Sequence, residues 1–149
     1  GELILKVYYT RNRYDIVYDI DGAKTTNTFY YQEAITPIAD PEKTGYTFAA
    51  WSPAVPATMP IDGIEVAATW TTNKYKVTFY TDDTKAATHY SNDHEYLTAV
   101  PSVNNPAARE GYRFLGWAYE GTTDIVNLAT ITVPANDISF VGNFLLAAR

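Results

Sequence analysis

Apolar and polar residues alternate in short runs, which predicts a chain of strands with little helix. An imperfect alternation predicts a first strand over residues 13–20. Asp21-Gly22 is a hairpin-turn signal that leads to a second strand near residues 25–31. Further strands are predicted at residues 46–51 and at about 64–70. The first half of the chain is therefore expected to form a sheet of about four strands.

Two places in this sheet leave alternatives open. Residues 32–35 are compatible with one short helical turn, which Pro37 and Pro41 would end because proline fixes φ and lacks an N–H. Strict alternation would put Trp51 on the opposite side of its strand from Phe48. Either a bulge next to Trp51 turns its ring toward the core, or the ring packs against a neighbouring module. We favour the bulge.

Three sequence anchors occur twice, in the same order, which indicates an internal repeat. They are residues 13–18 and 74–79, residues 45–51 and 111–117, and residues 59–70 and 133–144. The separation between equivalent residues grows along the chain, so the insertions fall between the anchors. Surface loops that join fixed strands behave in this way. The longer loop of the second copy is expected at residues 118–131.

The repeat predicts a mainly β (α+β) fold of two tandem small domains, each a roughly four-stranded sheet with little helix. We place repeat module 1 at residues 13–72 and repeat module 2 at residues 73–149. Residues 3–12 align with residues 64–73, and residues 1–12 are predicted to be the closing strand of a preceding repeat. The alternative is a private N-terminal strand that only resembles a repeat end. In the first case we expect the natural chain to continue upstream, with neighbouring repeats as partners.

Composition and charge narrow the possible functions. Of the 149 residues, 46% are hydrophobic and 15% aromatic, which is ample for packed cores. The net charge of −6, without a Lys/Arg cluster, disfavours nucleic-acid binding because acidic residues repel phosphates. The absence of cysteine excludes disulfides, thiolate catalysis and Cys-ligated zinc. No run approaches the roughly 18 apolar residues of a membrane helix, so no direct membrane insertion is expected. The first six residues do not resemble a secretory signal peptide.

Candidate catalytic and metal-binding residues are few. The acidic residues at 19–22 and 82–83 suggest calcium, but the ligand spacing of an EF-hand loop is missing, so we interpret them as turn residues. His89 and His94 lie near a serine and an aspartate at 91–93, as in a catalytic triad. Five residues apart on one strand, the two histidines would face opposite sides. We predict that both are surface-loop histidines, and we expect no cofactor and no metal.

The central anchor resembles a known family. Its pattern Pro-x-x-x-Gly-Tyr-x-Phe-x-x-Trp occupies residues 41–51 and is followed by a closing strand that ends in an aromatic residue. This pattern resembles the Listeria–Bacteroides repeat, also called the internalin B-repeat. Residues 109–117 match it as well, and the second copy departs at Ala107, where the first has Pro41. The resemblance implies a β-grasp-like fold and tandem arrays on secreted or wall-attached bacterial proteins, and it implies no active site.

The predicted function is that of a non-catalytic tandem repeat module of a bacterial cell-surface or secreted protein, located outside the cell or at its envelope. It would act as a stalk or spacer, with adhesion as an added role. The alternative is an adhesin module that binds a host extracellular protein or glycan through exposed aromatic residues and the 118–131 loop. A third hypothesis is an enzyme or an enzyme accessory domain. An aromatic patch outside the core would favour the adhesin, and a cleft with convergent carboxylates would favour the enzyme.

The aromatic residues are expected to divide between two roles. Most should fill the cores, because a small domain has few core positions and each must carry a large side chain. The predicted core residues are Tyr46, Phe48, Trp51, Trp70, Tyr112, Phe114, Trp117 and Phe144. The predicted ligand contacts are Tyr31, Tyr119, Glu120 and Asp124.

Overall fold

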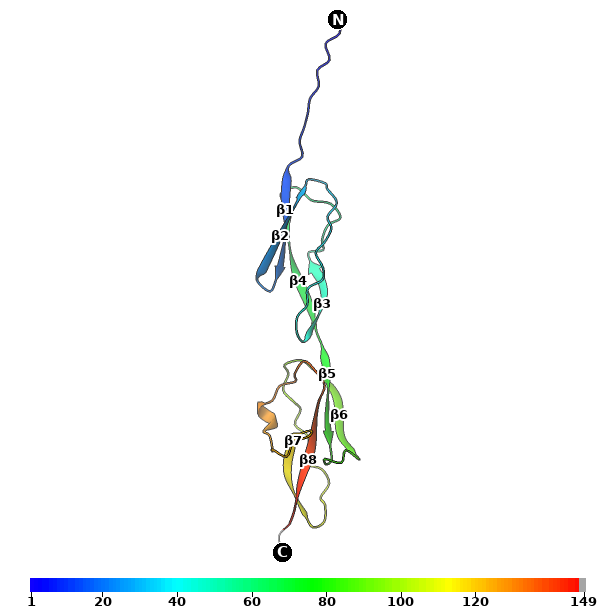
Figure 1. Ribbon diagram of the computed structural model, residues 1–149, viewed down its shortest axis with the longest axis vertical. Helices are drawn as coiled ribbons and strands as arrows, with labels where there is room; N and C mark the ends of the chain where they lie inside the picture. Colours follow the sequence, from blue (N-terminus) through cyan, green and yellow to red (C-terminus); the bar gives the residue numbers. More distant parts are fainter. Residues whose placement is uncertain (148–149) are drawn as a thin grey trace. The chain divides into compact units, whose positions relative to one another are not determined.

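The computed structural model, which describes residues 1–147, separates the chain into two compact units. Unit 1 comprises residues 1–43 and 48–71, and unit 2 comprises residues 44–47 together with the chain from residue 72 onward. Each unit contains one four-stranded sheet (Figure 1). Within the described residues, η1 (Leu128–Thr130) is the only helical segment. The prediction of a nearly all-β chain with two small tandem domains is confirmed.

The first sheet, which belongs to unit 1 except for residues 46, 47 and 72, consists of β1 (Arg13–Ile20), β2 (Ala23–Tyr30), β3 (Tyr46–Ser52) and β4 (Ile64–Thr72). The strand order is β2-β1-β4-β3, so the first and the last strand are neighbours in the middle of the sheet. β1 runs antiparallel to β2 and parallel to β4. A parallel pair needs a long crossover connection, which the chain between β2 and β4 provides.

The turn between β1 and β2 is a two-residue hairpin turn. Asp21 and Gly22 have φ angles of 52° and 93°, and positive φ at both positions matches the right-handed twist of the two strands. The Gly22 N–H donates a hydrogen bond of 2.7 Å to Asp19 Oδ1. The predicted turn is confirmed at residues 21 and 22, whereas Asp19 and Ile20 end β1.

The core of unit 1 combines strand and loop residues. Ile16, Tyr18 and Val66 point from β1 and β4 to one side of the sheet and are fully buried. Ile35 and Met59, from the loops on either side of β3, complete the cluster.

These two loops bond to each other, which corrects the expectation of a helical turn at residues 32–35. The Ile35 N–H donates to the Ala57 carbonyl at 3.0 Å, and the Met59 N–H donates to the Glu33 carbonyl at 2.8 Å. Ala34 and Thr58 form an isolated antiparallel bridge. The backbone groups that a helical turn would use locally are thus taken by a partner segment distant in sequence.

Unit 2 repeats this plan with β5 (Lys74–Tyr80), β6 (Thr88–Glu95), β7 (Tyr112–Tyr119) and β8 (Ile138–Leu146) in the order β6-β5-β8-β7. β5 is parallel to β8, and β7 is antiparallel to β8. The buried cluster contains Val77, Phe79, Val100, Trp117, Val133 and Phe140. The predicted 118–131 loop is shorter than expected, because Ala118 and Tyr119 belong to β7 and pair with β8.

A bulge precedes the central tryptophan of unit 2. The pairing of β7 with β8 shifts register between Phe114 and Gly116, so Leu115 is the extra residue. Phe114 and Trp117 consequently pack on each other with ring centroids 5.3 Å apart. In unit 1 the Phe48 and Trp51 rings are 5.2 Å apart in the same way. The second copy thus has the kind of bulge favoured for the first, and the bulge beside Trp51 itself stays a prediction.

The predicted core aromatics differ in burial. Trp117 is 5% exposed, and Trp51 and Phe114 are half-buried against the two cores. Half-buried residues further from the clusters are Tyr46, Phe48, Trp70 and Phe144. Tyr112 is 46% exposed and is not a core residue, which corrects the prediction. It begins β7 at the end of the sheet, where the Arg109 guanidinium lies over its ring.

Residues 1–12 contain no strand in this structure (Figure 1). Their apolar side chains are exposed, including Leu3 at 91% and Tyr9 at 90%. The assignment of this segment to a preceding repeat stays a prediction, as do the module boundaries after residues 12 and 72.

Candidate functional site

A second bulge, in β6, brings a histidine to the core side of unit 2. The pairing of β5 with β6 shifts between Phe79↔Tyr90 and Tyr80↔Thr88, so His89 is the extra residue. Its ring lies 5.3 Å from that of Trp117, while the Tyr90 ring lies 5.9 Å from that of Phe79. Because a bulge lets two successive side chains face the same way, both residues contact the core aromatics.

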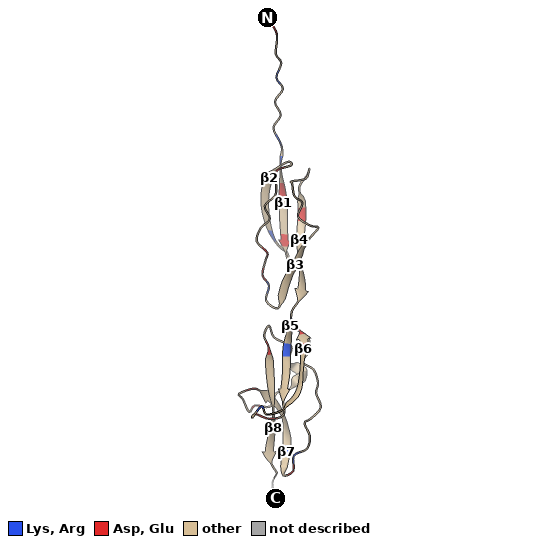
Figure 2. Ribbon diagram, turned by 90° about the vertical axis from the view of Figure 1, so that its right-hand side faces the viewer, with Lys and Arg blue, Asp and Glu red and all other residues tan. Residues whose placement is uncertain are grey.

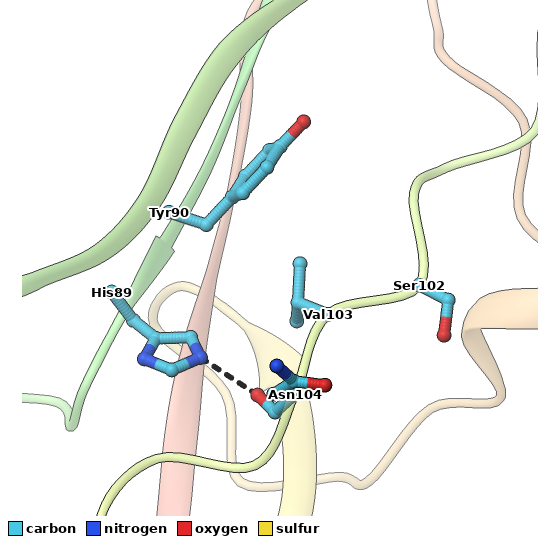
Figure 3. A pocket seen from close by; sticks show the side chains of 5 residues that line it. All are labelled: His89, Tyr90, Ser102, Val103 and Asn104. Atoms are coloured by element: carbon cyan, nitrogen blue, oxygen red, sulfur yellow. Dashed lines mark hydrogen bonds between the residues drawn. The ribbon is translucent and has the colours of Figure 1, made fainter.

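His89 and Tyr90 line a cavity of about 290 Å³ together with Ser102, Val103 and Asn104 (Figure 3). His89 Nε2 lies 2.7 Å from the Asn104 carbonyl oxygen. A carbonyl oxygen only accepts hydrogen bonds, so Nε2 carries the proton in this contact. The cavity thus joins an imidazole whose Nε2–H is already bonded to Asn104, an aromatic ring and an apolar side chain. Sequence reasoning did not find this cavity.

Both histidines are strand residues, which corrects the prediction of surface-loop histidines. They are half-buried in β6, and His94 accepts or donates a 2.7 Å hydrogen bond with the Tyr90 hydroxyl. The residues considered for a triad have other partners. Ser91 Oγ is 3.1 Å from Thr78 Oγ1, and Asp93 forms an ion pair of 3.5 Å with Lys76.

A second cavity, of about 360 Å³, lies at the turn after β7 and includes predicted contact residue Glu120. The Glu120 carboxylate accepts a 2.5 Å hydrogen bond from Lys85 Nζ, and this contact raises the pKa of Lys85 above its ordinary value. Thr122 closes the turn with hydrogen bonds from its N–H and its hydroxyl to the Tyr119 carbonyl. The charges of Lys85 and Glu120 therefore neutralise each other, whereas Asp83 adds a further negative charge to the lining, which also contains Thr122 and Thr123.

The other predicted contact residues are dispersed. Tyr119 is 37% exposed, and its ring stacks on Phe140 at 5.0 Å. Asp124 is exposed in the loop that follows. Tyr31 belongs to unit 1, where its ring packs edge-on against Tyr14 at 6.3 Å. Within unit 2 the structure thus groups Glu120 with the turn that Tyr119 begins.

Arg109 links the 82–85 turn to β8 in the same sheet. Arg109 donates a 2.7 Å hydrogen bond to Asp82 Oδ2, and its guanidinium lies 4.1 Å from the centre of the Phe144 ring. The hydroxyl of Thr84 and then the Arg109 guanidinium hold the pKa of Asp82 below its ordinary value. Asp82 thus stabilises the 82–85 turn, in keeping with its predicted turn role.

Charged residues are spread over strands and loops of both units (Figure 2). Across residues 1–147, no three His, Asp or Glu side chains gather in a way that could hold a metal ion. None of the described helical structure is long and apolar enough to cross a membrane.

The repeated sheet and its aromatic anchors define a class of tandem β-repeat proteins. The model of the Listeria-Bacteroides repeat domain matches residues 14–62 and 75–141, and the chain belongs to this family. The resemblance predicted from the sequence is confirmed. Internalin H from Listeria monocytogenes serovar 1/2a (strain ATCC BAA-679 / EGD-e) is 31% identical over 144 residues, which cover 88% of this chain. The match spans only 25% of the length of that relative. No solved structure matches the chain.

Proposed function

We propose that the chain is a non-catalytic spacer of a bacterial cell-surface or secreted protein. The observation that carries this proposal is the repetition of one self-contained sheet with minimal connection. β4 ends at Thr72 and β5 begins at Lys74, so Asn73 alone separates the last strand of one copy from the first strand of the next. Each sheet also has its own buried cluster. Because every copy closes its own core, copies can be added or removed without rebuilding a shared one.

A display experiment tests the spacer. A reporter domain is joined to a cell-wall anchor through the whole chain, through the chain without residues 73–149, or through an unrelated β-repeat of equal length. The accessibility of the reporter to an antibody-coated bead is then measured. We expect accessibility to fall with the shorter chain and to be restored by the unrelated repeat. Loss of accessibility with the unrelated repeat would contradict the proposal, because a spacer is defined by length and not by its surface.

The cavity beside Glu120 favours an adhesin as the second candidate function. Its Lys85–Glu120 pair and threonine hydroxyls offer the donors and acceptors that a glycan uses, and the exposed Tyr119 ring begins the same turn. The purified chain would be screened against glycans and extracellular-matrix proteins. A saturable ligand lost in Glu120→Gln and Tyr119→Ala, but retained in the control Asp93→Asn, would favour the adhesin. Binding that is unchanged by all three substitutions would exclude this site.

A further inference from the structure

Within unit 2, Asn73 uses all of its polar groups. Its N–H donates to the Gly45 carbonyl at 2.9 Å, and its carbonyl accepts from the Tyr96 N–H at 2.9 Å. Its side-chain amide donates to the Tyr75 hydroxyl at 3.3 Å, and its side-chain oxygen accepts from the Thr47 hydroxyl at 2.5 Å. Residues 45–47, which we name the Gly-Tyr segment, are thus bound to Asn73 by two hydrogen bonds.

The aromatic neighbours of Asn73 complete this binding. The Tyr96 ring packs edge-on against Tyr46 at 5.6 Å and against Tyr75 at 6.4 Å. It also covers Gly45 so closely that a Cβ at this residue would overlap the ring. Asn73, Tyr75 and Tyr96, which we name the Asn-Tyr-Tyr site, therefore recognise a glycine followed by a tyrosine.

The same site occurs at the start of unit 1. The Asn12 carbonyl accepts from the Tyr31 N–H at 2.8 Å, and the Asn12 side-chain amide donates to the Tyr14 hydroxyl at 3.4 Å. The Tyr14 and Tyr31 rings are edge-on at 6.3 Å. The two sites differ in their occupant. At Asn73, residues 45–47 accept from the N–H and donate to the side-chain oxygen, and no described residue does this at Asn12.

An unoccupied counterpart of the Gly-Tyr segment lies at residues 111–113. Gly111 has φ of 80°, as Gly45 has 81°, and its carbonyl accepts from the Ala147 N–H at 2.8 Å. A Cβ at Gly111 would meet nothing within 4 Å, and Tyr112 is 46% exposed. The exposure of Tyr112 follows, because its equivalent Tyr46 is covered by an Asn-Tyr-Tyr site and Tyr112 is not.

We propose that Asn12, Tyr14 and Tyr31 form a docking site for the Gly-Tyr segment of another repeat of this family, whose last strand is formed by residues 3–11. The occupied site of unit 2 supplies the chemistry of the occupant: a glycine with positive φ, a tyrosine ring and a hydroxyl donor. Residues 3–11 align with β4, which leads into Asn73 as they lead into Asn12. This inference rests on the proposed function, because it concerns how one repeat of a spacer binds the next.

Engineered cysteine pairs test the docking site, since the chain has no cysteine of its own. Residues 13–63 are placed ahead of residue 3, so that residues 3–11 can close the added copy. Cysteines replace Thr47 of the added copy and Asn12. The positive control is Thr47→Cys with Asn73→Cys in the unextended chain, and the negative control pairs Asn12→Cys with Thr26→Cys of the added copy. We expect the test pair to oxidise at least about tenfold faster than the negative control, because docking raises the effective thiol concentration.

A second extended chain separates docking from folding. It places residues 13–73 ahead of Arg13, so the added copy keeps β4 itself, and the test cysteine replaces Asn73 of that copy. Oxidation no faster than the negative control in both chains, with the positive control closing normally, would overturn the docking site. Oxidation in the second chain alone would overturn the assignment of residues 3–11 and retain the site. Cross-linking in solution does not depend on surface display, so failure of this proposal is distinguishable from failure of the spacer.

Discussion

At the scale of single residues, the two copies provide matched comparisons inside one chain. Tyr18 and Phe79 occupy equivalent positions, each fully buried beside the central tryptophan of its unit. The Tyr18 hydroxyl is buried, and no described residue offers it a hydrogen bond. A buried hydroxyl without a partner has lost its water contacts and gained nothing in exchange.

Tyr18→Phe should therefore stabilise the chain by about 1 kcal/mol, and the matched change Phe79→Tyr should destabilise it by about 1–3 kcal/mol. Urea denaturation of both variants measures the free energy of unfolding. A loss of stability in Tyr18→Phe would mean that an ordered water satisfies the hydroxyl.

The central tryptophans should differ in their contribution to stability. Trp117→Ala should cost about 3–5 kcal/mol, because the ring is 5% exposed and contacts Phe79, His89 and Phe114. Trp51 is half-buried, so Trp51→Ala removes less contact and should cost about 2 kcal/mol. Thermal or urea unfolding of each variant checks the order, and equal losses would contradict it.

At the scale of elements, the bulge in β7 depends on a glycine. Gly116 has φ of 138°, and a Cβ there would lie 2.7 Å from Ile125 Cγ2. Ala50, its equivalent in β3, does not have positive φ. The two copies therefore build the same approach to the tryptophan on different backbone conformations.

Gly116→Ala should cost about 1–3 kcal/mol, because alanine is strained at this φ and meets Ile125. The control Ala50→Gly should cost only about 0.5–1 kcal/mol, from added freedom of the unfolded chain. Chemical denaturation distinguishes the two. If Gly116→Ala were as mild as the control, the glycine would not be needed for the bulge.

The 82–85 turn should make unit 2 sensitive to acid. The pKa of Asp82 is lowered in the folded chain, so its contribution to stability is complete above the ordinary aspartate pKa of about 3.9 and is lost as the pH falls through the lowered value. Asp82→Asn should cost about 1 kcal/mol at neutral pH and progressively less below about pH 4. Asp83→Asn, next to it, is the control. A cost for Asp82→Asn that does not change with pH would contradict the ion pair.

Local patterns were sufficient to predict the four strands of the first sheet, because the hairpin turn, the prolines and the alternation all act over a few residues. The features missed depend on distant partners. Residues 32–35 bond to residues 57–59, and His89 faces the core only because its pairing with β5 shifts. Neither register nor partner is encoded in the spacing of side chains along one strand. The exposure of Tyr112 was missed for a related reason. A recurring aromatic residue predicts that its ring is packed, but it does not identify the residues that cover the ring.

At the scale of the whole molecule, the chain contains the same structural parts in two copies. Each copy of the repeat has a closing strand, an Asn-Tyr-Tyr site or its equivalent, and a Gly-Tyr segment or its counterpart, and the proposed docking explains why these recur together. The proposed spacer would need contacts that recur between neighbouring repeats, because its length would be set by the number of repeats and not by a shared core.

The central position of the parallel strands has a mechanical consequence. Tension applied to the ends of a repeat enters through β1 and β4, or through β5 and β8, and each of these pairs is parallel and adjacent. Pulling such a pair from opposite ends slides one strand along the other, so its hydrogen bonds bear the load together and cannot be peeled open one after another. A segment built in this way would resist stretching by flowing liquid, although each of its sheets has only four strands.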